Sequence, residues 1–154
     1  MKILSIYPWT HISSSALMID GKLVAASPEE RFTRVKWTTQ FPIQSANWCL
    51  KQANIQWKDI DRIVIPWNPS INISSASSRW DGNISWRGEM LSNIPSNIMK
   101  ALKSKPSKQM TVSFDDTKII YLNHHECHAA SAIFVSPLKK CDYLTIDGHG
   151  EKET

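Results

Sequence analysis

The pair Asp20-Gly21 constrains the fold of this chain more than any other short segment. Asp-Gly is a strong signal for a two-residue β-hairpin turn, because both positions tolerate the left-handed backbone that such a turn needs. The pair joins two strand-like segments, residues 13–19 and 22–27. A further strand-like segment, residues 2–7, precedes them. The chain is therefore expected to open with a three-stranded antiparallel meander.

A helix and a fourth strand are expected next. Apolar residues recur at three-and-four spacing after Phe41-Pro42, which predicts an amphipathic helix over residues 43–53. Residues 62–66 read as a strand, parallel to the first because a helix crosses over between them. The order strand-strand-strand-helix-strand is typical of the ribonuclease H-like α/β core found in actin, heat-shock chaperones and sugar kinases. We predict that fold class, with a mixed sheet.

Residues 67–117 differ in composition and are interpreted as an insertion on this core. Asn, Ser and Trp dominate its first part, and a helix is expected over residues 89–102. Trp80 and Trp86 either line a ligand or partner surface or anchor the insertion to the core. Regular structure is expected to resume with a strand at 118–122, a helix at 124–134 and a strand at 142–146.

Bulk properties exclude several classes of protein. The 154 residues fit one domain, and apolar runs such as residues 63–65 are far too short to span a membrane. The start has no signal-peptide pattern, so a cytoplasmic protein without a membrane partner is expected. The three cysteines show no CxxC spacing and are expected to be reduced thiols. The net charge of +4 is spread along the chain and does not favour a nucleic-acid partner.

A histidine cluster carries the clearest chemistry. Asn123 and Glu126 fit a capping box, which predicts that a helix begins at the cluster. His124 and His128 are then one turn apart on one face, where two imidazoles can bind one metal ion. His125 is rotated away and is interpreted as a surface or second-layer group. Capping and surface histidines are the alternative to a metal site.

Asp147 is the expected third ligand. It follows the predicted strand at 142–146, and such strand ends are the usual ligand position in open α/β sheets. Two imidazoles and one carboxylate with open positions suit Fe(II), with Zn(II) or Mn(II) as alternatives. Taken alone, Asp147 also fits a simple turn residue. Gly148 and Gly150 after it would let the backbone approach an anion closely.

Two further groups are candidates near the start of the chain. His11 follows the first strand and is a candidate general base for a hydroxyl group, although a turn histidine fits the spacing as well. Arg31, Arg34 and Lys36 would form a cationic rim for an anionic substrate such as a nucleotide phosphate. The alternative is a solvated loop with weak ion pairs.

Four ordered segments together resemble a known family. They are residues 11–17, residues 29–34 with Phe41-Pro42, residues 123–132 and residues 145–151. They resemble the amino-terminal part of the O-carbamoyltransferases of the nodulation-factor and antibiotic-tailoring type. The resemblance implies use of carbamoyl phosphate and ATP, formation of a carbamoyl-adenylate, and carbamoyl transfer to a hydroxyl group of a small molecule.

The resemblance also implies roles for particular residues. The family's metal ligands match His124, His128 and Asp147, and its candidate catalytic histidine matches His11. Where the family usually has an aspartate after that histidine, this chain has Ile12. The transfer domain is related to the enzymes that attach threonylcarbamoyl to tRNA.

The family's fold is a duplicated ribonuclease H-like core with its active site between the halves. Residues 1–154 would then be the amino-terminal lobe, with the second lobe beginning at about residues 142–154. A further aspartate ligand and the adenylating domain would lie outside this chain. Three interpretations follow: a truncated or split O-carbamoyltransferase with a complementary chain, a fragment of a tRNA threonylcarbamoyl transferase, or a non-catalytic metal-binding or interaction module. Self-association is also expected.

Overall fold

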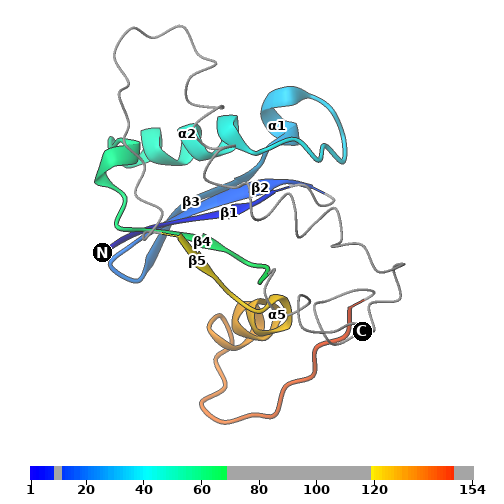
Figure 1. Ribbon diagram of the computed structural model, residues 1–154. Helices are drawn as coiled ribbons and strands as arrows, with labels where there is room; N and C mark the ends of the chain where they lie inside the picture. Colours follow the sequence, from blue (N-terminus) through cyan, green and yellow to red (C-terminus); the bar gives the residue numbers. More distant parts are fainter. Residues whose placement is uncertain (9–11, 69–118, 148–154) are drawn as a thin grey trace, which may run out of the picture.

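The computed structural model describes residues 1–8, 12–68 and 119–147, and in this part the chain forms one five-stranded mixed sheet with helices on both sides (Figure 1). The strand order across the sheet is β3-β2-β1-β4-β5. The strands are β1 (Lys2–Tyr7), β2 (Ser14–Ile19), β3 (Lys22–Pro28), β4 (Arg62–Ile65) and β5 (Ile119–Tyr121). The helices are α1 (Glu30–Thr33), α2 (Ile43–Gln52), the 3₁₀ turn η1 (Trp57–Asp59) and α5 (His124–Ile133).

The antiparallel opening is confirmed. β1 pairs with β2, and β2 with β3, both antiparallel. Asp20 and Gly21 connect β2 to β3 with φ of 49° and 78°, so both turn residues adopt the positive φ expected of an Asp-Gly hairpin.

The crossover is confirmed as well. β4 lies parallel to β1 after the passage through α2, and β5 lies parallel to β4. In register, Leu17, Leu4 and Ile63 stand side by side on three neighbouring strands, and all three are fully buried. This row is the centre of the hydrophobic core. The other core side chains are Ile6, Ala25 and Ile65 of the strands, residues of α2, residues of η1 and its neighbourhood, and Trp67.

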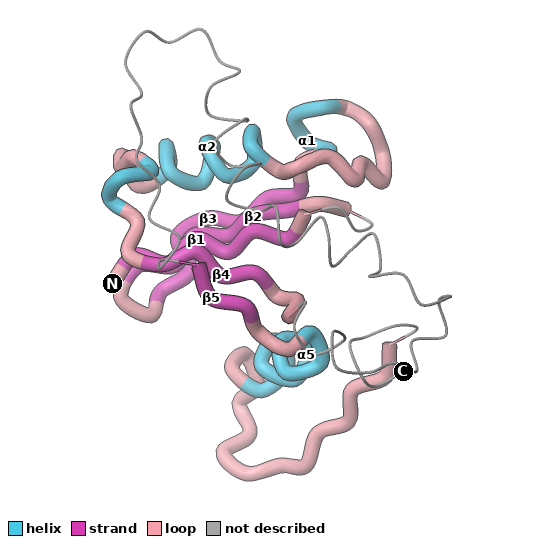
Figure 2. Tube along the Cα trace, in the orientation of Figure 1, coloured by secondary structure: helices cyan, strands magenta, loops and turns pink. Residues whose placement is uncertain are grey.

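The helices form two groups about the sheet. α1 and α2 lie on one side, and α5 lies on the other, beside the ends of β4 and β5 (Figure 2). α2 packs against β2 and β3 through Ala46, Cys49 and Leu50, the residues that its three-and-four spacing singled out. Among the described residues, no helix is long and apolar enough to cross a bilayer.

One prediction about an element needs correction. Residues 142–146 were expected to form a strand, but they have no regular structure, and Tyr143, Leu144 and Ile146 are 64–82% exposed. A strand needs a hydrogen-bonded neighbour, and none of the described strands pairs with this segment. In the charged segment at residues 29–36, for which a solvated loop was one of two alternatives, residues 30–33 form the short helix α1.

The insertion expected at about residues 67–117 begins at Trp67. Trp67 is 7% exposed and belongs to the core. The remainder of the expected insertion, including the helix at 89–102, Trp80 and Trp86, lies outside the described residues.

Most strands have their carboxyl ends at the same edge of the sheet. β1 ends at Tyr7, which pairs with Ser14, and Ser14 pairs with Pro28 at the end of β3. Because β4 and β5 run parallel to β1, they end at this edge too. The carboxyl ends of β1, β3, β4 and β5, and the segments that follow them, therefore meet at one edge. In open α/β sheets this edge is where ligands bind.

Candidate metal centre

α5 begins directly beyond this edge, and Asn123 determines where it begins. The β4–β5 pairing ends with a hydrogen bond from the Leu122 backbone N–H to the Ile65 carbonyl, 2.9 Å long. Asn123 then adopts an extended backbone, and its side-chain oxygen accepts the N–H groups of His125 and Glu126 at 2.9 and 3.3 Å. This confirms Asn123 as the N-cap residue. The first turn of α5, which carries His124 and His125, is thereby fixed to the end of β5.

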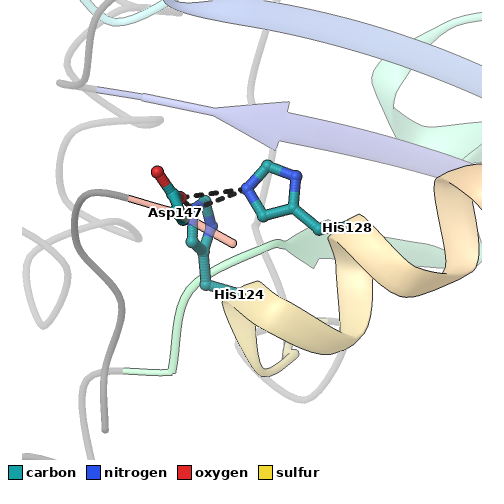
Figure 3. A group of neighbouring side chains, drawn as sticks. All are labelled: His124, His128 and Asp147. Carbon is teal, nitrogen blue, oxygen red and sulfur yellow. Dashed lines mark hydrogen bonds and ion pairs between the residues drawn. The ribbon is translucent and has the colours of Figure 1, made fainter. Parts of the chain in front are cut away.

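Three side-chain atoms from two segments converge at this point (Figure 3). The Nε2 atom of His124 lies 2.9 Å from Oδ2 of Asp147, and Nε2 of His128 lies 3.1 Å from the same oxygen. The two Nε2 atoms are 3.1 Å apart. His124 and His128 come from consecutive turns of α5, and Asp147 comes from the segment that ends the described chain. The structure thus brings together the three residues that the sequence predicted as ligands.

The triangle has the size of a metal-ligand set. Protein nitrogen and oxygen ligands bind a divalent transition-metal ion at about 2.1 Å. Donor atoms about 3 Å apart at that radius subtend about 90° at the ion, which suits one face of an octahedron better than a tetrahedron. Two imidazoles and a carboxylate on one octahedral face are the ligand set of non-haem Fe(II) sites. The residues present therefore fit a divalent metal ion.

Hydrogen bonding to His124 supports the same conclusion. Its Nδ1 atom lies 3.2 Å from the backbone carbonyl oxygen of Pro66, which can only accept a hydrogen bond, so Nδ1 carries the proton. In the neutral ring, Nε2 then presents its lone pair toward Asp147, whose carboxylate oxygen is also an electron donor. Two lone-pair atoms at 2.9 Å repel each other unless a metal ion lies between them or the Nε2–H of His128, 3.1 Å from each, is shared between them. A backbone carbonyl on the far nitrogen is the usual outer support of a metal-binding histidine.

The centre has a buried wall and an open side. The His124 side chain is 8% exposed, whereas those of Asp147 and His128 are 34% and 50% exposed. Aromatic rings surround His124: Trp67 lies at 4.9 Å between ring centroids and Tyr7 at 6.1 Å. The centre is therefore more accessible from the side of His128 and Asp147 than from that of His124.

Two further residues of α5, His125 and Cys127, lie next to the ligands in the sequence but differ in burial. Of the two positions predicted for His125, surface or second layer, its 7% exposure excludes the surface. Its ring lies 5.9 Å from that of His124 and 6.3 Å from that of His128, which makes it an inner neighbour of the ligands. Cys127 is partly exposed and is not part of the ligand group.

Of the remaining predicted site residues, the structure describes the three cations but not His11 or the two glycines. Arg31 lies in α1, and Arg34 and Lys36 lie in the segment that follows it; all three are exposed. Because α1 follows β3, these residues lie at the same edge of the sheet as the metal ligands. His11, Gly148 and Gly150 lie outside the described residues.

Sequence reasoning missed two features of this edge. Pro66 and Trp67 supply the carbonyl and a ring that hold His124, and only the pairing of β4 with β5 brings them there. Glu29 begins the charged segment for which a solvated loop was one alternative, and it is 1% exposed. Its carboxylate accepts the backbone N–H groups of Gln44 and Ser45 at 3.2 and 2.7 Å, which caps the start of α2.

The fold and the site together define a mixed α/β domain with a candidate two-histidine, one-carboxylate metal centre at the carboxyl edge of its sheet. Comparison with known proteins then gives the family. Residues 2–154 match the family described as "Carbamoyltransferase N-terminus", and the chain belongs to it.

Three curated relatives are similar to this chain. The chain is 34% identical over 160 residues to the uncharacterized protein sll1178 of Synechocystis, covering 99% of this chain and 26% of the relative. It is 28% identical over 141 residues to the nodulation protein NolNO of Sinorhizobium fredii, covering 92% of this chain and 20% of that protein. An uncharacterized 19.2 kDa protein of Rhizobium etli is 42% identical over 53 residues, covering 34% of this chain and 31% of that protein. The chain thus spans about a fifth to a quarter of the length of the two relatives that it matches over most of its own length.

Proposed function

We propose that this chain is the amino-terminal lobe of the carbamoyl-transfer domain of an O-carbamoyltransferase and that His124, His128 and Asp147 hold a divalent metal ion there. Fe(II) suits the ligand set best, with Zn(II) or Mn(II) as alternatives. The observation that carries the proposal is the triangle of Nε2, Nε2 and Oδ2 atoms at 2.9–3.1 Å in a chain of the carbamoyltransferase family. When bound, the ion supplies a Lewis acid for a carbonyl oxygen.

The proposed reaction moves a carbamoyl group from carbamoyl-adenylate, made from carbamoyl phosphate and ATP, to a hydroxyl group of a small-molecule acceptor. The acceptor oxygen forms a bond to the carbamoyl carbon, and the bond from that carbon to the adenylate phosphate oxygen breaks, so AMP leaves. The acceptor's proton passes to a base, for which His11 is the candidate. Arg31, Arg34 and Lys36 would receive the phosphate, and the backbone at Gly148 and Gly150 would approach it.

The proposal includes a further part of the enzyme that covers the open side of this lobe. Large apolar side chains beyond α5 are exposed, which is unusual for a finished surface. The most exposed of them are Phe134, Val135, Leu144 and Ile146, at 82–86%. The strand order and connections support a ribonuclease H-like lobe, and in the proposed enzyme a second lobe of the same kind would pack against this surface. That lobe lies in the same protein or in a complementary chain; self-association is the remaining possibility.

Separating the two half-reactions tests the proposal. In the full-length enzyme, Asp147→Asn should abolish carbamoyl transfer to the acceptor, because the neutral amide is a poor metal ligand. Formation of carbamoyl-adenylate should continue in the same variant, since it occurs in the adenylating domain. The release of pyrophosphate measures this half-reaction. Normal transfer by Asp147→Asn would remove the metal centre from the mechanism. Loss of both half-reactions together would contradict the division of labour between the domains.

A further inference from the structure

The residues that follow β4 surround the most buried ligand of the metal centre. His124 is 6% exposed, and Trp67 beside it is 7% exposed. Their ring centroids are 4.9 Å apart with the ring planes tilted by 45°. The Tyr7 ring lies parallel to the His124 ring within 10°, with centroids 6.1 Å apart. His124 therefore has little room to change its side-chain conformation.

The same short segment also supplies the hydrogen-bond acceptor for this ring. Pro66 directly precedes Trp67, and its carbonyl oxygen lies 3.2 Å from Nδ1 of His124. The neighbouring Ile65 carbonyl is taken up by the Leu122 backbone N–H, which is the last bond between the two strands. After β5 the chain continues into α5. The Pro66 carbonyl then accepts a hydrogen bond from the side chain of His124. The position of that carbonyl depends on how the backbone at residues 66–67 is held.

Trp67 holds that backbone, because its side chain is anchored in the hydrophobic core. One residue thus performs two tasks: its ring limits the rotation of the His124 ring, and its anchoring keeps the preceding carbonyl within reach of Nδ1. Both tasks favour the tautomer with the proton on Nδ1 and the lone pair on Nε2. Outer groups that orient a metal-binding histidine in this way typically contribute about 10- to 100-fold to metal affinity.

We propose that Trp67 is a positioning residue of the metal centre, which locks the His124 imidazole in the Nδ1–H tautomer with Nε2 directed at Asp147 and His128. The effect on metal affinity rests on the proposed metal centre. The tautomer does not, because it is a property of the metal-free protein. The two ideas therefore fail separately.

Two measurements on the purified protein test the inference. Long-range ¹H–¹⁵N correlation spectra of the metal-free protein, recorded at about pH 8, report the tautomer of each histidine. Titration with Co(II), followed by its visible absorption, reports affinity and ligand geometry. The wild type should show His124 protonated on Nδ1. Trp67→Leu should lose this single tautomer and bind Co(II) about 10- to 100-fold more weakly, and Trp67→Phe should regain most of the affinity because it keeps a ring.

Trp57 provides the matched control. It is a tryptophan of the same core, 6% exposed, whose indole N–H bonds Asn47 and not a metal ligand. Trp57→Leu should lower the stability of the fold to a similar degree without changing the Co(II) affinity or the His124 tautomer. A similar loss of affinity in both leucine variants would reduce Trp67 to a general core residue and overturn the inference.

The other outcomes separate the two proposals. Equal Co(II) affinity of Trp67→Leu and wild type overturns the positioning role while leaving the metal centre intact. An Nδ1–H tautomer in a wild-type protein that binds no metal supports the positioning of the ring but removes the metal centre. If Trp67→Leu does not fold, the wild-type spectrum still decides, because a His124 ring protonated on Nε2 contradicts the lock.

Discussion

Replacing Glu29, which follows β3, tests whether a single buried carboxylate holds the start of α2 in place. The side chain is 1% exposed and accepts two backbone N–H groups from the first turn of α2, at 3.2 and 2.7 Å. α2 has no side-chain cap of its own, because its N-cap residue is Pro42. The two N–H groups at the helix start therefore depend on this carboxylate.

The expected loss follows from these contacts. A hydrogen bond to a charged group contributes about 1.5–3 kcal/mol, and a negative charge at a helix start adds about 0.3–1 kcal/mol. Glu29→Ala removes both and should lower the free energy of unfolding by about 3–5 kcal/mol, the sum of two such bonds less partial rehydration of the freed N–H groups. Glu29→Gln keeps the shape and one acceptor oxygen, so it should lower the free energy of unfolding by about half as much.

Equilibrium unfolding in urea measures these differences on the metal-free protein. Glu126→Gln is the matched control, because Glu126 also lies at the start of a helix but is exposed. Its midpoint should stay close to that of the wild type. The reasoning about Glu29 would be refuted by a Glu29→Ala variant that unfolds at the same urea concentration as the Glu126→Gln control.

Three further predictions concern the rest of the chain. Burial raises the pKa of the Cys49 thiol above its ordinary value of 9.0, so the unfolded chain loses this proton first as pH rises. Stability should therefore fall above about pH 9 more steeply in the wild type than in Cys49→Ala, and parallel curves from urea unfolding would contradict the burial argument. Asn123→Ala removes the cap of α5 and should cost about 0.5–2 kcal/mol by the same assay, whereas an unchanged midpoint would mean that the cap bonds contribute nothing. His11→Ala in the full-length enzyme should reduce turnover while elemental analysis finds the metal still in place; normal turnover would exclude His11 as the base.

Local patterns in the sequence were sufficient to predict most of the sheet. The Asp20-Gly21 turn fixed the meander because a two-residue connection leaves few ways to pair its strands. α2 was predicted within one residue at its end, because its apolar spacing is regular. The parallel placement of β4 followed from the crossover alone.

The metal ligands were predictable for a different reason. Asn123 marks the helix start, and i, i+4 spacing then places His124 and His128 on one face. Asp147 required the family resemblance in addition. The segment before it was predicted as a strand, because its alternating apolar residues have the strand period, but no described strand pairs with it.

Groups whose role depends on neighbours that are distant in the sequence were not predicted. The Pro66 carbonyl and the Trp67 ring reach His124 only because β4 and β5 are adjacent in the sheet. Glu29 resembles its exposed neighbours in sequence, and only the packing of α2 against β3 shows that it is buried. Spacing along a chain reports which residues share an element, whereas these contacts arise between elements.

The central claim is that His124, His128 and Asp147 bind one divalent metal ion. Its most direct test is the iron content per chain, by elemental analysis, after anaerobic loading with Fe(II) and removal of free metal. The wild type and Cys127→Ser, a change between the two histidines on the same helix, should each retain about one ion per chain. His128→Ala should retain almost none. Equal iron content in His128→Ala and the wild type would contradict the claim.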